Sequence, residues 1–288
     1  MKVKGIILAG GSGTRLAPIT KVFSKQLIPV FDKPMFYYPL STLMLAGIKE
    51  YLIVTGSEYI DSYKGYLGDG AHLGIKVEYI IQDKPNGIPE GLILGKDFIG
   101  DDNVLFILGD NIFYGSGLQE ILAETINQNR KSVVFGTFVN NPSQFGVASV
   151  IGDSIHIEEK PLNPKSNIAV TGLYYYRNID LIYLDDLIPS QRGELEITDL
   201  NNIIGGNGHL DLVNLGRGFS WFDCGSFDGL LDAANFIRTI EKNQGIKIGC
   251  IEEIAYAKKF ISRRMLKSII DLFSSNNLYR CYLERLLD

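Results

Sequence analysis

A glycine-rich turn near the start of the chain carries the residues best suited to chemistry. Residues 3–9 form an almost unbroken apolar run, which predicts a strand buried on both faces, and this run leads directly into Gly10, Gly11 and Gly13. Glycine has no Cβ, so the backbone here can approach a ligand closely and turn its N–H groups toward an anion. Arg15 adds a planar, permanent charge that suits phosphate oxygens. The turn therefore predicts a cradle for a triphosphate.

The spacing of these glycines differs from two common nucleotide-binding motifs. A dinucleotide fingerprint requires G-x-G-x-x-G, but counting from Gly11 and Gly13 the third position is Leu16. A P-loop requires G-x-x-x-x-G-K-[ST], and no lysine follows Gly10. A glycine-rich turn between a strand and a helix that binds no ligand is the alternative that this segment alone leaves open.

Two polar side chains follow other predicted strands. Gln82 comes after a strand at 76–81, in a loop shaped by Pro85 and Gly87, and its carboxamide can donate to and accept from the imide edge of a pyrimidine. Asp110 comes after a buried strand at 104–108 and could hold Mg²⁺, which takes one or two carboxylates and completes its shell with water and phosphate oxygens. The alternatives are an incidental glutamine in a surface turn and an aspartate that only caps its turn.

Strands and helices alternate through the first half of the chain. We expect strands at 3–9, 51–55, 76–81, 104–108 and 132–138, and helices at 35–46, 59–67 and 118–127. This order predicts an α/β fold with a Rossmann-like, doubly wound and mostly parallel sheet that carries helices on both faces. Ligands of such sheets bind beyond the carboxyl ends of the strands, which is where the glycine turn, Gln82 and Asp110 stand.

From about residue 144 the pattern changes to shorter strands of alternating polarity. We expect strands at 145–151, 155–159 and 169–176, with a spacing that suggests hairpins laid over the sheet edge, and helices at 179–187, 197–204 and 227–243. The tail at 257–288 is helical by its period, with Ile261, Met265, Ile269, Leu272 and Phe273 on one side. We therefore expect one unit over 1–243, with halves at about 1–140 and 141–243, and a C-terminal helical segment at 244–288.

Composition limits the classes of function. The 288 residues are 45% hydrophobic, which is ample for a continuous core, and the net charge of −5 argues against general binding to nucleic acid or an anionic membrane. The first apolar run is too short for a signal sequence or a membrane span, so we expect a cytoplasmic protein. The three cysteines (Cys224, Cys250 and Cys281) fit reduced thiols, and the three histidines (His72, His156 and His209) form no metal-binding spacing.

Several segments together resemble a known enzyme family. Residues 8–16 read L-A-G-G-S-G-T-R-L, residues 24–30 read S-K-Q-L-I-P-V, and residues 37–41 read Y-Y-P-L-S. These motifs are similar to the signature of the sugar-1-phosphate nucleotidylyltransferases, above all of those that use dTTP and glucose 1-phosphate. The resemblance, which continues to the end of the chain, implies Mg²⁺-assisted, in-line formation of dTDP-glucose and pyrophosphate, the first step toward dTDP-rhamnose or another dTDP-deoxysugar. It also implies a homotetramer with a regulatory nucleotide-sugar site at subunit contacts.

The resemblance further implies roles for individual residues. The catalytic set is Arg15, Lys25, Asp110 and Asp223, of which the two aspartates are metal ligands. Residues 141–243 supply the sugar-binding half, where Glu159 contacts sugar hydroxyls and Lys160 meets the sugar phosphate. The implied nucleotide-binding residues are Leu8, Gly10, Gly11, Ser12, Gly13, Thr14, Arg15, Gln26, Gln82, Pro85 and Gly87, and the implied sugar-phosphate-binding residues are Gly146, Glu159, Lys160, Val170, Gly172 and Arg192.

The sequence departs from the family pattern in a few places. Asn86 and the run Ile88-Pro-Glu-Gly91 replace the Asp and the Leu-Ala-Gln-Ala that are typical of thymidylyltransferases. Phe145 stands where a tyrosine is expected, and Cys224 and Ser226 stand where threonines are usual. An enzyme that uses UTP or an amino-sugar 1-phosphate is the alternative that follows from the 82–91 loop. A non-catalytic sensor of nucleotide sugars is a further alternative, disfavoured because the four implied catalytic residues are all present. An NAD-dependent oxidoreductase is disfavoured because the glycine fingerprint is missing.

Overall fold

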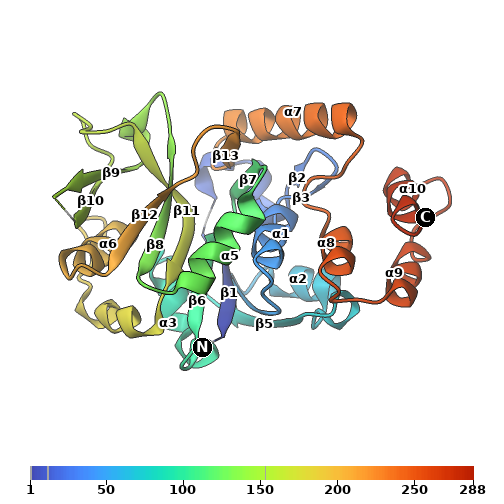
Figure 1. Ribbon diagram of the computed structural model, residues 1–288, viewed down its shortest axis with the longest axis horizontal. Coiled ribbons are helices and arrows are strands. Elements are labelled where there is room, and N and C mark those ends of the chain that lie inside the picture. Colours follow the sequence, from blue (N-terminus) through green and yellow to red (C-terminus); the bar gives the residue numbers. More distant parts are fainter. Residues whose placement is uncertain (1, 12, 153) are drawn as a thin grey trace.

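A nine-stranded mixed sheet forms the centre of the protein (Figure 1). The computed structural model describes residues 2–11, 13–152 and 154–288. Strand β1 (Val3–Leu8) lies between β4 (Glu50–Thr55) and β6 (Asn103–Leu108) and is parallel to both, and β5 (Lys76–Ile81) continues the sheet beside β4. Because these four strands run in one direction, their carboxyl ends open on the same edge of the sheet.

The rest of the sheet meets β6 in the antiparallel sense. Strand β11 (Ile168–Tyr176) is antiparallel to β6, to β8 (Ser132–Phe138) and to β9 (Gly146–Ile151). The sheet ends with β10 (Ser154–Glu159) beside β9 on one side and with β12 (Leu210–Asn214) beside β8. The predicted strands are present, but the expectation that residues 145–176 overlie the sheet edge is wrong. The pairing of β11 with β6 makes them an extension of the same sheet.

Both faces of the sheet are covered by helices because the β1 side chains alternate between them. Ile7 points into a core shared with α1 (Tyr37–Leu45), α2 (Ile60–Leu67), α5 (Leu118–Gln128) and α8 (Ile251–Ala257). Ile6 points into a second core shared with α3 (Glu90–Leu94), α4 (Lys96–Ile99) and α6 (Ile197–Gly206). This is the expected doubly wound arrangement.

A separate two-stranded ribbon brings distant parts of the chain together at the edge of the sheet. Strand β7 (Asn111–Gly115) directly follows the end of β6, and β13 (Phe219–Asp223) pairs with it in the antiparallel sense. The register places Asp223 opposite Asn111. Helix α7 (Phe227–Gln244) starts after this ribbon, where the Ser226 hydroxyl accepts a hydrogen bond from the Gly229 N–H at 3.1 Å, and runs across the top of the molecule in Figure 1.

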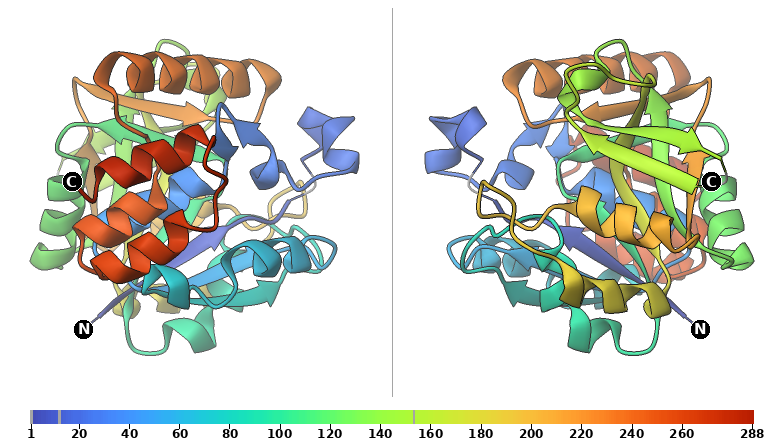
Figure 2. Two further views of the ribbon diagram at one scale, coloured as in Figure 1. Left: turned by 90° about the vertical axis from the view of Figure 1, so that its right-hand side faces the viewer. Right: turned by 90° about the vertical axis from the view of Figure 1, so that its left-hand side faces the viewer.

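The C-terminal segment packs at the end of the molecule opposite β9 and β10 (Figures 1 and 2). It contains α9 (Arg263–Ile270) and α10 (Leu278–Arg285). Residues 258–262 before α9 and 271–277 between the two helices form no helix, so the expectation of a helical tail throughout 257–288 is only partly correct. Tyr279 donates to Glu252 at 2.6 Å, which ties α10 to α8. Leu272, expected on the apolar side, is 83% exposed because it lies in the break.

Short segments complete the chain. The 3₁₀ helices η1 (Thr14–Leu16), η2 (Ile19–Lys21) and η3 (Lys25–Leu27) project from the side of the body in Figure 2, and a small hairpin of β2 (Pro29–Val30) and β3 (Lys33–Pro34) follows. Further 3₁₀ turns are η4 (Ala71–Leu73), η5 (Pro142–Gln144) and η6 (Asn178–Asp186), the last replacing the helix expected at 179–187.

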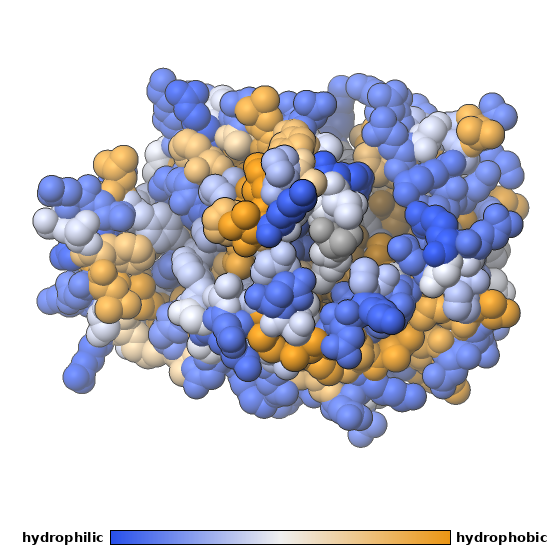
Figure 3. Space-filling model, turned by 180° about the vertical axis from the view of Figure 1, so that it is seen from behind, coloured by the Kyte–Doolittle hydropathy of each residue, from blue (hydrophilic) through white to orange (hydrophobic). Residues whose placement is uncertain are grey.

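Figure 3 shows hydrophilic residues over most of one face, with hydrophobic residues in several smaller groups between them. Over residues 2–11, 13–152 and 154–288, no helix combines the length and apolar character needed to cross a bilayer.

Candidate active site

A cleft opens beyond the carboxyl ends of β1, β5 and β6. It encloses about 430 Å³. Along its wall are the glycine turn that follows β1, the 82–88 loop that follows β5, and Asp110, which follows β6. All the predicted nucleotide-binding residues that the structure describes line this cleft: Leu8, Gly10, Gly11, Gly13, Thr14, Arg15, Gln26, Gln82, Pro85 and Gly87. The remaining one, Ser12, lies outside the described residues.

The glycine turn has the conformation that its composition predicts. Gly11 and Gly13 have φ angles of 101° and 56°, in the region that side chains disfavour. Gly10 matters in a different way: a Cβ there would lie 1.9 Å from Oε1 of Gln82, so a larger residue would force the Gln82 side chain to shift. The Thr20 hydroxyl donates to the Gly13 carbonyl at 2.9 Å and holds the far side of the turn. The backbone of the turn therefore faces the cleft and touches the loop that carries Gln82.

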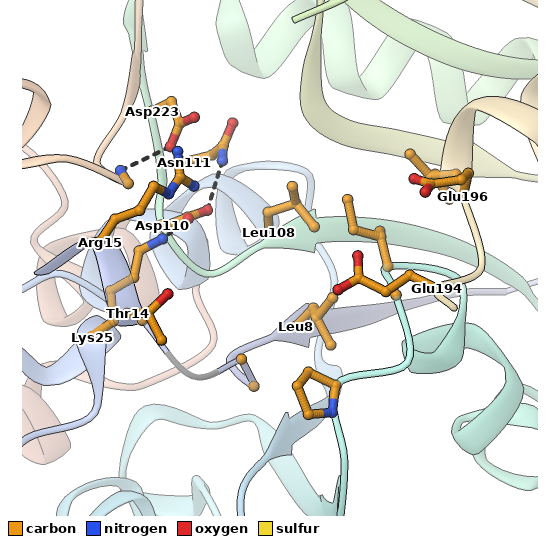
Figure 4. A pocket seen from close by; sticks show the side chains of 18 of the residues that line it. Leu8, Thr14, Arg15, Lys25, Leu108, Asp110, Asn111, Glu194, Glu196 and Asp223 are labelled. Carbon is orange, nitrogen blue, oxygen red and sulfur yellow. Dashed lines mark hydrogen bonds and ion pairs between the residues drawn. The ribbon is translucent and has the colours of Figure 1, made fainter. Parts of the chain in front are cut away.

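Two cations and two carboxylates gather at one end of the cleft (Figure 4). The Lys25 ammonium forms an ion pair with Asp110. Arg15 lies beside Asp223, since a Cβ built on Gly225 would meet Nη2 of Arg15 at 2.9 Å and Oδ1 of Asp223 at 2.8 Å. Asp223 also accepts a hydrogen bond from the Gly225 N–H at 2.8 Å. The four residues predicted to be catalytic thus surround one cavity, because the β7–β13 ribbon carries Asp223 to the end of β6.

The two carboxylates differ in their ionisation. Burial by itself would raise the pKa of Asp110, but the charge and hydrogen bond of Lys25 outweigh burial and hold this pKa below its ordinary value. Burial raises the pKa of Asp223, and the negative charge of Asp110 raises it further, against the weaker opposite effects of Lys25 and Arg15. The charged form of Asp110 is therefore stabilised by Lys25, whereas no cation stabilises the charged form of Asp223 to the same extent.

Asn111, which was not among the predicted site residues, organises this end of the cleft. Its Nδ2 donates to Asp110 at 2.8 Å, and its Oδ1 accepts from the Gly172 N–H at 3.0 Å and from the Trp221 indole at 2.6 Å. Asn111 thereby connects the metal-ligand candidate Asp110 to the β11 backbone. Its position directly after Asp110, at the end of a buried strand, is the signal that could have identified it.

The predicted sugar-phosphate residues line the cleft or a hollow of about 160 Å³ that adjoins it. Glu159 and Lys160 belong to both spaces, whereas Gly146, Val170 and Gly172 line the adjoining hollow. The register of β11 shifts between Val170 and Tyr174, next to the contact between Gly172 and Asn111. The cleft and the hollow therefore share part of their lining, and the residues predicted for the nucleotide and for the sugar phosphate lie in adjoining spaces.

Lys160 has an unusual backbone. Its φ angle of 44° lies in the left-handed region that side chains rarely adopt. Its ammonium lies 3.4 Å from the Glu159 carboxylate, which also accepts from the Thr198 hydroxyl at 2.9 Å. Glu159 is thus held by two partners at the point where the cleft and the hollow meet.

The comparisons with known proteins identify the family. A sequence profile described as nucleotidyl transferase matches residues 4–240. This chain belongs to the nucleotidyl transferase family. The predicted family and its class of enzyme are therefore confirmed.

Relatives and solved structures agree with this membership. The nucleotidyl transferase is 48% identical over 287 residues to the glucose-1-phosphate thymidylyltransferase of Neisseria meningitidis serogroup A, covering 99% of each chain. It is 47% identical over 266 residues to that of Mycobacterium tuberculosis, covering 92% of each. A Bacillus anthracis crystal structure, described as a glucose-1-phosphate thymidylyltransferase in complex with a sucrose, has a TM-score of 0.76 and 42% identity and covers 82% of this chain and 95% of that one. A UDP-glucose pyrophosphorylase complexed with UDP-glucose has a TM-score of 0.72 and 25% identity, covering 83% and 99%.

Acidic residues on the opposite wall complete the cleft of this nucleotidyl transferase. Glu194 and Glu196 face the cluster of Arg15 and Lys25 across the cavity (Figure 4). Arg192 lines the cleft, but its guanidinium binds both oxygens of Glu196 at 2.9 and 3.0 Å. Burial would raise the pKa of Glu196, yet the hydrogen bonds from Ser190 and Arg192 lower it. Glu194 and Glu196 were not among the predicted site residues, because their spacing also fits an ordinary helix start.

The pair Asp110 and Asp223 suits a divalent cation. Both are oxygen donors, they are close enough for one charge to raise the other's pKa, and Asp223 has no ion-pair partner among the described residues. Mg²⁺ needs only one or two carboxylates when phosphate oxygens and water supply the rest of its shell. Within residues 2–11, 13–152 and 154–288, no group of three or more His, Cys, Asp or Glu residues has metal-binding geometry. The donor set therefore fits a cation that is shared with a phosphate ligand.

Proposed function

We propose that this nucleotidyl transferase transfers a thymidylyl group from dTTP to α-D-glucose 1-phosphate and so produces dTDP-glucose and pyrophosphate. The observation that supports the proposal most directly is the single cleft. It combines a glycine turn, Arg15 and Lys25 beside two carboxylates, and the pair Glu159 and Lys160 at the adjoining hollow. The relatives that match almost the whole chain carry the name glucose-1-phosphate thymidylyltransferase.

The reaction joins two anions, so the residues of the cleft must neutralise charge and align the partners. A phosphate oxygen of glucose 1-phosphate attacks the α-phosphorus, the bond from this phosphorus to the β-phosphate bridge breaks, and pyrophosphate leaves with its negative charge. In this scheme Arg15 stabilises the leaving pyrophosphate, Lys25 the α-phosphate and Lys160 the attacking phosphate, without a covalent enzyme intermediate. Glu159 binds sugar hydroxyls.

Recognition of the two substrates is proposed to occur at opposite ends of this space. Gln82 and Gly87 read the base, and the backbone of the glycine turn cradles the triphosphate. Gly146, Val170 and Gly172 supply backbone contacts to the sugar, with Arg192 as a further partner near its phosphate. Asp110 and Asp223 would hold Mg²⁺, which when bound supplies positive charge to the phosphates.

A substrate matrix tests the proposal. Pyrophosphate release is measured with dTTP or UTP, each combined with glucose 1-phosphate or glucosamine 1-phosphate, in the presence of Mg²⁺. We expect the highest kcat/KM for dTTP with glucose 1-phosphate. A preference for UTP or for the amino sugar would establish a different nucleotidylyltransferase instead. The absence of pyrophosphate release with every pair would favour a non-catalytic sensor of nucleotide sugars.

Assembly and regulation are further parts of the proposal. A second cavity of about 440 Å³ lies between α1, the start of α5 and residues 246–258. It presents Lys247 and Lys258 together with Tyr114, a combination suited to the phosphates and base of a nucleotide sugar. We assign the regulatory site to this cavity and the subunit contacts of a homotetramer to the segment 244–288. A cytoplasmic location follows from the proposed substrates, since dTTP is an intracellular metabolite. Analytical ultracentrifugation measures whether the protein is a tetramer. Inhibition of turnover by dTDP-glucose in the wild type, and its loss in Lys258→Ala, would support the regulatory site.

A further inference from the structure

The carboxamide of Gln82 is held between two neighbours at the base end of the cleft. Gln82 is 6% exposed and lines the cavity beside Gly10. Its Oε1 lies against Gly10, where even a Cβ would come within 1.9 Å. Its Nε2 donates a hydrogen bond to the carboxylate of Glu90, at the start of α3. The amide is therefore fixed on its nitrogen side by an acid and packed on its oxygen side against the glycine turn.

Glu90 is itself surrounded by donors. Besides Nε2 of Gln82, its carboxylate accepts from the Asn86 backbone N–H at 2.9 Å and from Asn86 Nδ2 at 2.7 Å. The two oxygens of Glu90 thus receive three N–H groups from the 82–88 loop. Every hydrogen bond that the Glu90 carboxylate makes in this structure is one that it accepts.

This arrangement decides which way the Gln82 amide points. The oxygen and nitrogen of a glutamine side chain are nearly equal in size, so shape alone does not distinguish the two orientations. An acceptor-only neighbour does distinguish them, because the reversed amide would set the Gln82 oxygen against a Glu90 oxygen and lose the hydrogen bond. The carbonyl of Gln82 is consequently the group presented on the side of Gly10 and the cleft.

We propose that Glu90 is a positioning residue which locks Gln82 as a hydrogen-bond acceptor and thereby makes the site select bases that carry a proton on N3. This inference rests on the proposed function, in which Gln82 reads the base. Thymine and uracil have an N3–H donor, whereas N3 of cytosine is an acceptor with a lone pair. A fixed Gln82 carbonyl accepts a hydrogen bond from the N3–H of thymine or uracil and repels the N3 lone pair of cytosine. Without Glu90 the amide can rotate and satisfy either base.

The deoxynucleotides dUTP and dCTP provide a matched test. Both lack the 5-methyl group and both contain deoxyribose, so they differ only at N3 and position 4 of the base. The measured quantity is the ratio of kcat/KM for dUTP to kcat/KM for dCTP, with glucose 1-phosphate saturating. Glu90→Met removes the acceptor at similar size. Asn86→Ala is the control, because it removes a side-chain partner of Glu90 but leaves the bond to Gln82 in place.

We expect Glu90→Met to lower the ratio by about 10- to 100-fold, as expected for loss of a hydrogen bond to a charged group. The change should appear mainly in KM, since Gln82 does not contact the reacting phosphorus in the proposed scheme. Asn86→Ala should keep the ratio of the wild type. The ratio for Glu90→Gln should lie between those of the wild type and of Glu90→Met, because the amide at position 90 can present either an acceptor or a donor to Gln82.

Two results would overturn the inference. One is a ratio for Glu90→Met within about twofold of the wild type, and the other is an equal fall in Asn86→Ala, which would show that Glu90 only orders the loop. If the melting curve shows that Glu90→Met does not fold, Glu90→Gln is used in its place. A dUTP-to-dCTP ratio below that of the wild type would then support the inference, and an unchanged ratio would overturn it. Failure of the proposed function is distinguishable, since the wild type would then release no pyrophosphate from dTTP or dUTP.

Discussion

Replacing Lys25 by methionine removes the cation that this structure places closest to the proposed metal-ligand pair. The Lys25 side chain is 11% exposed and its partner Asp110 17%, so the ion pair is largely shielded from water. Loss of one partner of a fully buried pair costs about 3–5 kcal/mol of folding free energy. Because both groups keep some contact with solvent, we expect a destabilisation of about 3 kcal/mol or less, which a domain with about 5–15 kcal/mol of stability tolerates.

The catalytic loss should be at least as large and should have a different cause. Cationic groups that stabilise transferring phosphoryl groups contribute about 10³- to 10⁵-fold in rate. Lys25 shares its charge with Asp110, so we expect Lys25→Met to lower kcat by at least about 100-fold, equivalent to about 2.7 kcal/mol of transition-state stabilisation. Lys25→Arg keeps the charge and should retain more activity than Lys25→Met.

The assay is pyrophosphate release at saturating dTTP, glucose 1-phosphate and Mg²⁺, with the melting temperature of each variant measured in parallel. These two readouts separate loss of folding from loss of chemistry. A Lys25→Met protein that melts as a single folded species and turns over within about tenfold of the wild type would refute the role of Lys25 in catalysis.

Three further predictions concern other parts of the molecule. Asp223→Asn should abolish Mg²⁺-dependent turnover while the protein stays folded, and full activity in a Mg²⁺ titration would contradict the metal assignment. Gly10→Ala should raise KM for dTTP by about tenfold or more, since its Cβ would lie 1.9 Å from Oε1 of Gln82, and unchanged dTTP binding by calorimetry would contradict that packing. Burial raises the pKa of Glu252 despite the hydrogen bond from Tyr279. An acid with a raised folded-state pKa stabilises fully below its unfolded value of about 4.5 and loses this contribution as the pH rises through the folded-state pKa, by up to about 1.4 kcal/mol per pH unit. The melting temperature of Glu252→Gln should therefore increase relative to the wild type as the pH rises above about 4.5, and a constant difference would show that Glu252 does not titrate differently on folding.

The local sequence was sufficient to predict those parts of the site that directly follow a single strand. The run from Val3 to Leu8 is apolar enough to be a buried strand, and the glycines after it permit one kind of turn. Gln82 and Asp110 could be placed in the same way, because parallel strands end on one edge. The parallel part of the fold, and the meeting of these residues at one edge of the sheet, were therefore predictable from the residues themselves.

Features that depend on pairing between distant segments were not predictable from local pattern. The position of Asp223 beside Asp110 depends on the β7–β13 register, and only the family motif indicated it. The extension of the sheet by β11 depends on its pairing with β6, which alternating polarity does not reveal. The apolar residues of the tail keep helical spacing across residues 271–277, although these residues form no helix. The spacing alone therefore did not predict this interruption.

The cations of the cleft matter to the proposed reaction, because the chain as a whole has a net charge of −5 and the two proposed substrates are phosphorylated. Three of the four lining cations are held by carboxylates: Lys25 by Asp110, Lys160 by Glu159 and Arg192 by Glu196. Each pairing keeps a cation in place at the wall of the cleft, and each must loosen when phosphate oxygens compete for the same N–H groups. Arg15, which has no ion pair among the residues that the structure describes, can meet an incoming triphosphate without such an exchange.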